Sequence, residues 1–201
     1  MDNAARTADY HAIMAARRRD LREQLAGVLG TKHEFVWELG CGHGHFLTAY
    51  AHAHPKDLCI GIDLASDRVS RAIRKRNRAS LGNLYFLQAE ARLFLENLPS
   101  KSAFNRLFIL FPDPWPKLRH HKNRIINADF LAAAARNATE GARLYFRTDH
   151  ESYFLSALTV ISTHRDWSLV DEPWGFEHPT VFQSRASKYQ SLVAAAAGPR
   201  P

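Results

Sequence analysis

Apolar runs alternate with amphipathic stretches along most of the chain. The runs of nearly continuous apolar character predict strands that are buried on both faces, and they span 35–39, 58–63, 83–89, 104–111 and 142–149. The stretches between them repeat apolar residues every three or four positions and predict helices over 45–54, 66–79, 91–98, 125–138 and 150–163. A further helix is predicted over 8–29, and Gly141 is expected to stop the helix over 125–138. Two short strand-like pieces lie near 167–171 and 180–186.

Strands that alternate with helices imply a parallel sheet covered on both faces. Right-handed crossovers then give a doubly wound α/β sandwich, whose ligand crevice lies at the carboxyl ends of the strands. We expect one domain over 1–201, with a basic helical segment at 1–30 and an Ala-rich tail that is frayed over 191–201.

Composition places the chain among ordinary globular proteins with a polyanionic partner. Of 201 residues, 46% are hydrophobic and 23% charged, and 27 Lys and Arg against 20 Asp and Glu give a net charge of +7. This excess favours nucleic acid or an anionic membrane as a partner. The sequence has no run of about 20 apolar residues and no hydrophobic signal core near its start, so we expect neither a membrane helix nor secretion.

The cysteines and histidines do not predict a metal site. Cys41 and Cys59 have no CxxC spacing, which favours a reducing, cytoplasmic compartment over a disulfide scaffold or a thiolate zinc site. Two His pairs, at 43/45 and 52/54, lack the neighbouring carboxylates or thiolates that would complete a coordination set. We therefore expect no metal.

The segment ELGCGHGHF, residues 38–46, follows the first strand and opens a helix. Its glycines, Gly40, Gly42 and Gly44, suit a backbone that turns with positive φ and approaches a ligand closely. Asp63 ends the second strand, where a carboxylate can accept from both ribose hydroxyls, and Glu90 follows the third strand, near an adenine edge. Together with Glu38, these acids suit a nucleoside that carries a cationic group and disfavour a pyrophosphate, which points to S-adenosylmethionine.

The segment FPDPWPKLRHHKNR, residues 111–124, follows the fourth strand and opens at the same crevice. Prolines on both sides of Asp113 restrict the backbone and lower the entropy lost when its carboxylate engages a substrate. Trp115 offers a face on which a base can stack. Four cations can neutralise phosphates, and these are Lys117, Arg119, Lys122 and Arg124.

These two segments, with Thr148-Asp149 after the fifth strand and Thr180-Val181-Phe182, resemble the bacterial tRNA (guanine-N7)-methyltransferase family. The resemblance covers about Glu38 to Arg185 and rests most on the PDPWPK-x-RHHK signature. It implies a Rossmann-like class I methyltransferase fold, with a mostly parallel sheet and an antiparallel C-terminal strand. It also implies an S-adenosylmethionine-dependent enzyme that methylates N7 of guanine 46 in the variable loop of tRNA.

The resemblance implies a role for each matching position. The cofactor-binding set is Glu38, Gly40, Gly42, Gly44, Asp63, Glu90 and Asp113, and Asp113 is also the catalytic residue. The tRNA-binding set is Trp115, Lys117, Arg119, His120, His121, Lys122, Arg124, Asp149, Thr180 and Gln183. The chain departs from the family at Asp63 and Gln183, where the family has Glu, at Gln88-Ala89-Glu90, where it has Gly-Asp-Ala, and at Leu118 and Asn123, where it has basic residues.

Two alternatives remain open from the sequence. Exocyclic-amine methyltransferases for adenine or cytosine carry a related acid- and proline-containing loop after strand four, although the basic extension is not part of that pattern. A tRNA-binding module with weakened catalysis is the second alternative, and it draws support from Gln183, because an amide accepts only one of the two hydrogen bonds that a carboxylate accepts from guanine. We expect a monomer or weak homodimer that binds tRNA and no membrane.

Overall fold

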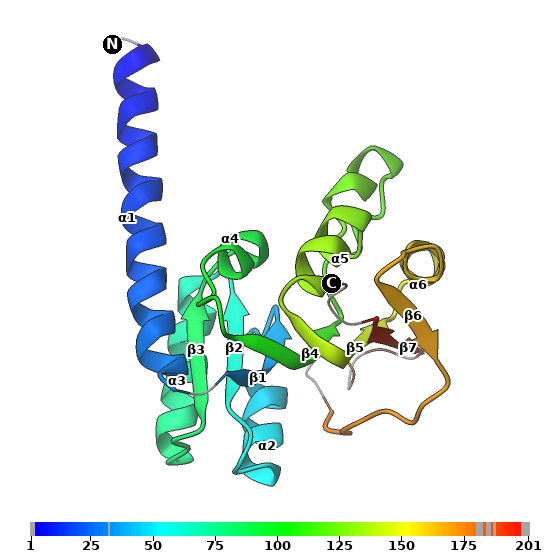
Figure 1. Ribbon diagram of the computed structural model, residues 1–201. Coiled ribbons are helices and arrows are strands. Elements are labelled where there is room, and N and C mark those ends of the chain that lie inside the picture. The colour runs from blue at the N-terminus through cyan, green and yellow to red at the C-terminus, as the bar shows by residue number, and fades with distance from the viewer. Residues whose placement is uncertain (1–2, 32, 180–182, 184–185, 187, 198–201) are drawn as a thin grey trace.

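A single seven-stranded sheet, in the order β3-β2-β1-β4-β5-β7-β6, organises the molecule in the computed structural model (Figure 1). The structure describes residues 3–31, 33–179, 183, 186 and 188–197, with no side chain described before residue 12. The strands are β1 (Glu34–Leu39), β2 (Cys59–Asp63), β3 (Leu84–Gln88), β4 (Ala103–Leu110), β5 (Ala138–Thr148), β6 (Trp167–Val170) and β7 (Gln190–Ala196). Strands β1 to β5 pair in parallel, and β7 pairs antiparallel to both β5 and β6. The predicted doubly wound, mostly parallel sheet with an antiparallel C-terminal strand is confirmed.

Helices cover both faces of the sheet. They are α1 (Asn3–Leu29), α2 (His45–Ala53), α3 (Ser66–Arg78), α4 (Ala91–Glu96), α5 (Ala128–Ala135) and α6 (Glu151–Ser162), with one 3-10 turn, η1 (Leu118–Asn123). One core cluster joins buried residues of α1, α4, α5 and α6 to one face, and a second joins those of α2 and α3 to the other. The central strands β1, β2 and β4 are therefore buried on both sides over most of their length, which accounts for their continuous apolar runs in the sequence.

The C-terminal segment differs from the prediction. Residues 191–196 were expected to belong to a frayed tail, but they lie in β7, between β5 and β6. Alanine is a helix former and gave no strand signal. Here both neighbouring strands supply backbone partners, and the small side chain of Ala194 fits opposite Leu144 and Leu169. The strand expected at 180–186 lies largely outside the described residues, and neither of its two described positions, 183 and 186, is in a strand.

Gly141 is not the helix stop that the sequence predicted. Helix α5 already ends at Ala135, and β5 begins at Ala138, so Gly141 lies inside the strand, with φ of +67°. The register of β5 with β4 shifts in this part of the strand, between the pairs Phe104–Ala138 and Arg106–Arg143. A glycine at such an irregularity allows the backbone to bend.

Helix α1 stands partly clear of the body (Figure 1). Its C-terminal half packs on the sheet through Leu21, Leu25 and Leu29, all of which are buried. Arg22 near this end donates from Nε to the side-chain oxygen of Asn97 at 2.7 Å, and Arg18 pairs with Glu96 at 3.6 Å. The helix is thus fixed to the fold at one end. Among the described residues, no helix is long and apolar enough to cross a membrane.

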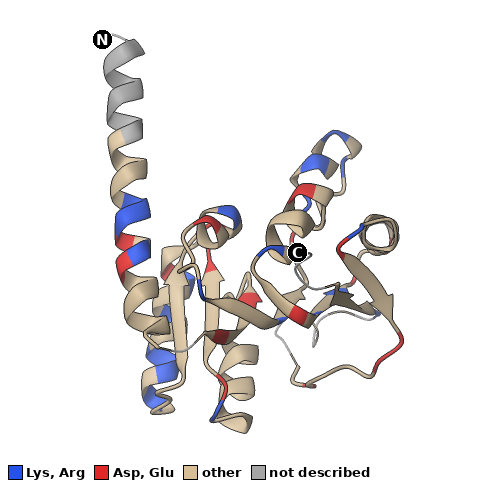
Figure 2. Cartoon of the chain, viewed as in Figure 1, with Lys and Arg blue, Asp and Glu red and all other residues tan. Residues whose placement is uncertain are grey.

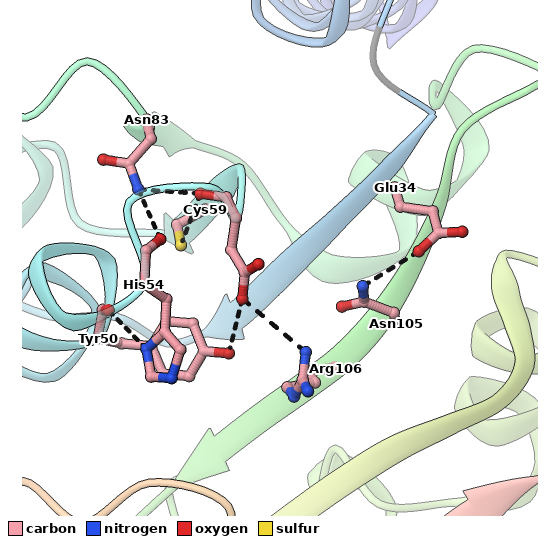
Figure 3. A network of polar contacts seen from close by, with 8 residues as sticks. Glu34, Tyr50, His54, Cys59, Asn83, Asn105 and Arg106 are labelled. Atoms are coloured by element: carbon pink, nitrogen blue, oxygen red, sulfur yellow. Dashed lines mark hydrogen bonds and ion pairs between the residues drawn. The ribbon is translucent and has the colours of Figure 1, made fainter.

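The amino edge of the sheet carries a structural polar network (Figure 3). Asn83 donates from Nδ2 to the backbone oxygens of Ala51, His54 and Asp57 at 2.9–3.1 Å, which joins the end of α2 to the loop before β2. The Tyr50 hydroxyl donates to the Asp57 carboxylate at 3.0 Å. A hollow of about 450 Å³ opens at this edge, between the starts of β1 and β2. The predicted site residues lie at the opposite edge.

Candidate active site at the carboxyl edge

The carboxyl ends of five parallel strands bring the predicted acids to one edge of the sheet. In the order of the strands these acids are Glu90, Asp63, Glu38, Asp113 and Asp149. The chain runs outward from β1 through β2 to β3, and then returns to place β4 on the other side of β1. This reversal is the topological switch point at which doubly wound sheets form a ligand crevice. The loop after β1 and the loop after β4 therefore face the same crevice.

The loop after β1 is held by Asp63. One oxygen of its carboxylate accepts from the backbone N–H of Gly42, and the other accepts from that of Ala65, each at 2.9 Å. Asp63 is buried, and Arg68 lies 3.9 Å from it. Each carboxylate oxygen has a second lone pair, so Asp63 can fix the glycine loop and still accept from a ligand hydroxyl.

The three glycines of this loop have different reasons to be glycine. All three have positive φ, between +53° and +74°. A Cβ at Gly44 would lie 2.5 Å from the ring of Phe86 and 2.8 Å from the Cβ of Ala72, so this glycine lets α2 approach β3 and α3. A Cβ at Gly40 or Gly42 would meet nothing within 4 Å. These two residues therefore border open space, as a ligand cradle requires.

Glu38 is a buried carboxyl group with an unsatisfied oxygen. Its side chain is 4% exposed, and its Oε2 atom has no hydrogen-bond partner among the described residues. Burial raises the pKa of Glu38 to about 8, against the effect of a hydrogen bond with the backbone of Leu47. A buried polar atom without a partner is costly, and a cationic ligand in the crevice would remove that cost.

Glu90 has a structural role that the sequence analysis did not assign to it. It is the N-cap of α4, and its two carboxylate oxygens accept from the backbone N–H groups of Arg92 and Leu93, each at 2.9 Å. The residue is exposed at the end of β3. The cap fixes where the carboxylate lies, next to the position predicted for the adenine.

The loop after β4 is held in an unusual backbone conformation. Phe111 and Trp115 have φ of +51° and +45°, in the left-handed region that residues other than glycine rarely adopt. These two residues bracket Asp113, which is exposed and makes no side-chain hydrogen bond or ion pair with the described residues. Backbone strain of this kind costs about 1–3 kcal/mol per residue and persists where the surrounding structure enforces it.

Arg124 enforces part of this conformation. The sequence predicted that it contacts tRNA, but its side chain is 2% exposed. It donates to the backbone oxygen of Pro114 at 2.9 Å and to the backbone and hydroxyl oxygens of Ser152 at 3.1 and 3.0 Å. Its guanidinium also lies 4.8 Å from the centre of the Tyr153 ring. Arg124 therefore anchors the loop to the start of α6, which corrects its assignment to the phosphate-binding set.

The other cations of the segment remain accessible. Lys117, Arg119 and Lys122 are exposed, and the last two lie in the 3-10 turn η1. His120 stands edge-on to Trp115, with ring centroids 5.9 Å apart, and His121 is partly buried. Three of the four predicted cations are therefore exposed in the segment that follows Asp113.

Arg147, which the sequence analysis did not identify, organises the far end of the site. It is 4% exposed and donates to both carboxylate oxygens of Glu177, at 2.8 and 3.1 Å. It lies between the rings of Trp174 and Tyr189, 4.0 and 4.7 Å from their centres. A buried cation inside an apolar strand was the available signal, because such a charge requires a partner.

Gln183 belongs to this arginine cluster. Its Oε1 accepts from Arg147 at 3.1 Å, and its amide donates to the Tyr189 hydroxyl at 3.1 Å. Asp149 is exposed one residue after β5, and Thr180 lies outside the described residues. Within the described part of the chain, no group of three His, Cys, Asp or Glu side chains is arranged to hold a metal ion.

The residues present fit S-adenosylmethionine. Glu38 has an unsatisfied buried oxygen for a cationic group, Asp63 retains lone pairs for a ribose, and Gly40 and Gly42 border open space. The backbone N–H of Gly42 in the glycine loop already donates to the Asp63 carboxylate, so it is not available to a pyrophosphate.

Comparisons with known proteins agree with this fit. Residues 32–199 match a family described as "Putative methyltransferase". A tRNA (guanine-N(7)-)-methyltransferase from Listeria monocytogenes is 31% identical over 159 residues, which cover 79% of this chain and 74% of the relative. One from Thermus thermophilus is 30% identical over 146 residues, and there the match covers 73% of this chain and 47% of the relative. The chain thus spans about half to three quarters of the length of these relatives.

Solved structures support the fold. An antibiotic-resistance methyltransferase, Kmr, has a TM-score of 0.58 and 22% identity, with 91% of this chain and 94% of that chain covered. A 16S rRNA (adenine(1408)-N(1))-methyltransferase from Catenulisporales acidiphilia has a TM-score of 0.58 and 19% identity, with 90% and 93% covered. The family match and the Listeria relative confirm the resemblance seen in the sequence, and the chain belongs to the tRNA (guanine-N(7)-)-methyltransferase family.

Proposed function

We propose that this protein transfers the methyl group of S-adenosylmethionine to N7 of guanine 46 in the variable loop of tRNA. The observation that carries this proposal is the position of Asp113. It is an exposed carboxylate in a strained, anchored loop at the switch point, beside a glycine loop that borders open space. Family membership supplies the tRNA guanine as substrate class.

The chemistry requires positioning more than proton transfer. Guanine N7 has a lone pair and no proton, so its attack on a methyl carbon needs no general base. When bound, S-adenosylmethionine supplies that methyl group on a sulfonium. Transfer would form the N7–C bond as the S–C bond of the sulfonium breaks and S-adenosylhomocysteine leaves as a neutral thioether. Positive charge would then lie on the imidazole ring of the base, where the Asp113 carboxylate would stabilise it. The rigid loop around Asp113 avoids the entropy cost of ordering this group at the moment of reaction.

The remaining residues divide between cofactor and RNA. Glu38, Asp63 and Glu90 hold the cofactor from one side of the crevice. Trp115 and Lys117 shape the base pocket with His120, and Asp149, Thr180 and Gln183 contact the substrate from the other side. Arg119, His121 and Lys122 meet the RNA backbone. Arg124 is excluded from this set because its guanidinium is buried.

We further infer that the enzyme acts in the cytoplasm, as a monomer or weak homodimer, without a metal and without a membrane. Cys41 and Cys59 are both buried, and the Cys59 thiol donates to the backbone oxygen of Asp57, which is compatible with a reducing compartment. The partner is then tRNA alone, and the net charge of +7 attracts that polyanion.

The decisive experiment incubates the purified chain with unmodified tRNA and methyl-labelled S-adenosylmethionine, and then maps the labelled nucleotide. We expect label at one guanine of the variable loop, with a product sensitive to alkali and borohydride, because methylation at N7 destabilises the imidazole ring. Label on an adenine or cytosine amine would support the exocyclic-amine alternative. Binding of tRNA without any transfer would support the binding-module alternative.

A further inference from the structure

A strip of cations on α3 lies outside the site described above. Arg71, Arg74, Lys75 and Arg78 are spaced at i, i+3, i+4 and i+7, which places them on one face of the helix. Figure 2 shows Lys and Arg gathered along this helix. Together with His43 and His45 from the glycine loop and the start of α2, they line a hollow of about 350 Å³. We call these six residues the α2–α3 basic hollow.

The fold does not neutralise these charges. None of the four α3 cations of the hollow pairs with a carboxylate among the described residues. The other two basic residues of α3 do have partners, since Arg68 lies 3.9 Å from Asp63, and Arg76 donates to Asn77 and stacks on Tyr85. Like charges three and four positions apart destabilise a helix by about 0.2–0.5 kcal/mol per pair. The strip therefore has an energetic cost that folding alone does not explain.

Lys75 is the most costly of these unpaired cations. Its Nζ atom is buried and has no hydrogen-bond partner among the described residues. Burial lowers the pKa of Lys75, and the charge of Arg78 lowers it further. Burial also lowers the pKa of His45, with Lys75 as the next cause. A buried ammonium without a partner is unfavourable, and an anion's oxygen in the hollow would satisfy it.

The position of the hollow relates it to the crevice. His43 and His45 belong to the loop that follows β1 at the carboxyl edge, and α3 starts after β2 at the same edge. The hollow therefore begins beside the glycine loop and extends along the face that α2 and α3 cover. The basic turn η1 follows β4, on the opposite side of β1. Two separate positive surfaces thus flank the crevice.

We propose that the α2–α3 basic hollow binds a phosphate segment of the RNA backbone, as a second contact distinct from the η1 turn. This proposal rests on the proposed function, which supplies RNA as the substrate. Guanidinium groups can bind phosphate oxygens in pairs, and the Lys75 ammonium completes the site as a buried point charge. The RNA then spans the crevice, and the target base enters between the two surfaces.

The test compares two triple variants with equal charge loss. Arg71→Gln/Arg74→Gln/Arg78→Gln removes the exposed charges of the hollow, whereas Lys56→Gln/Lys101→Gln/Arg165→Gln removes exposed charges just before β2, β4 and β6, at the opposite edge. Binding of tRNA is measured by fluorescence anisotropy between about 50 and 200 mM salt. We expect the first variant to bind about tenfold or more weakly, with a flatter salt dependence, and the control to stay within about twofold.

Methylation and cofactor binding separate this proposal from the proposed function. For the first variant we expect a raised KM for tRNA, an unchanged kcat at saturating tRNA and unchanged binding of S-adenosylmethionine by calorimetry. If this variant bound tRNA with wild-type affinity and wild-type salt slope, the proposed RNA contact at the hollow would be wrong. Methylation by the wild-type chain would still support the proposed function. If the wild-type chain methylated nothing, a variant-specific loss of RNA binding would still support the hollow. Loss of binding to phosphatidylserine vesicles with tRNA affinity intact would assign the hollow to a membrane and overturn the proposal.

A single substitution in the hollow distinguishes a loss of RNA binding from a loss of folding. Lys75→Met removes the buried ammonium but keeps the length of the side chain, so we expect a higher or equal melting temperature together with weaker tRNA binding. A residue that only supported the fold would lower both quantities when replaced. Lower stability with unchanged RNA affinity in this variant would count against the hollow as a phosphate site.

Discussion

Asp113 carries a prediction at the residue scale. Asp113→Asn keeps the size of the side chain and removes its charge, so it should leave the fold unchanged and lower the affinity for S-adenosylmethionine much less than it lowers turnover. We expect kcat to fall about a hundredfold or more, the scale of losing one electrostatic stabiliser. Single-turnover kinetics with tRNA would measure this fall. Wild-type turnover in the variant would remove Asp113 from the chemistry.

Arg124 separates a buried anchor from a phosphate contact. Lys cannot reproduce its hydrogen bonds to Pro114 and Ser152, so Arg124→Lys should lower the free energy of unfolding by about 1.5–3 kcal/mol. Because the loop around Asp113 loosens, kcat should fall as well, while the salt dependence of tRNA binding stays at its wild-type slope. Chemical denaturation measures the free energy of unfolding, and anisotropy titrations measure the salt dependence of tRNA binding. A flatter salt slope would restore Arg124 to the phosphate-binding set.

Glu38 predicts how stability depends on pH in the absence of cofactor. Its pKa in the folded chain is raised from 4.5 to about 8, so the folded state keeps a proton that the unfolded state has lost between these values. Its contribution to stability is therefore complete below about pH 4.5 and is lost as the pH rises toward 8. Glu38→Gln does not titrate. We expect the wild-type melting temperature to fall relative to that of the variant from pH 5 to 8, as scanning calorimetry would show, whereas parallel curves would contradict the shift.

At the scale of elements, α1 is tied to the fold by one end only. Leu25 is fully buried, so Leu25→Ala should lower the free energy of unfolding by about 2–5 kcal/mol through lost burial and a cavity. Ile13 on the same helix is 53% exposed, and Ile13→Ala should change stability by less than about 0.5 kcal/mol. Urea denaturation of both variants provides the comparison. Equal effects at the two positions would mean that α1 packs along its whole length.

Most elements were predictable because their signals are local. Buried parallel strands give continuous apolar runs, and the predicted strand at 104–111 is β4, Ala103–Leu110. The segment 190–196 lacked such a signal, since its alanines fit a helix or a tail equally well. It became β7 because β5 and β6 offer it backbone partners on both sides. Gly141 was assigned to a helix end for a similar reason, since a turn-forming residue marks either a stop or a strand irregularity.

At the scale of the whole molecule, the η1 turn should contribute to the salt dependence of RNA binding. Arg119 and Lys122 are exposed on this turn, and their replacement by Ala removes two proposed phosphate contacts. We expect weaker tRNA binding and a salt slope smaller by up to about one unit per lost contact. Anisotropy titrations at several salt concentrations measure the slope. An unchanged slope would mean that the turn does not contact phosphate.

The sequence by itself determined the order of strands and helices, the glycine loop, and the acids at strand ends, because each depends on residue type and on spacing within a few positions. The tertiary structure decided which polar groups face a ligand and which support the fold. Arg124 reads as a phosphate contact in the sequence, yet packing against α6 buries it. The sequence analysis assigned no role to the four α3 cations of the basic hollow, and the contact of α3 with α2 gathers them beside His43 and His45. The burial of Arg124 and the approach of the α3 cations to His43 and His45 depend on contacts between different elements, so no local pattern could reveal them.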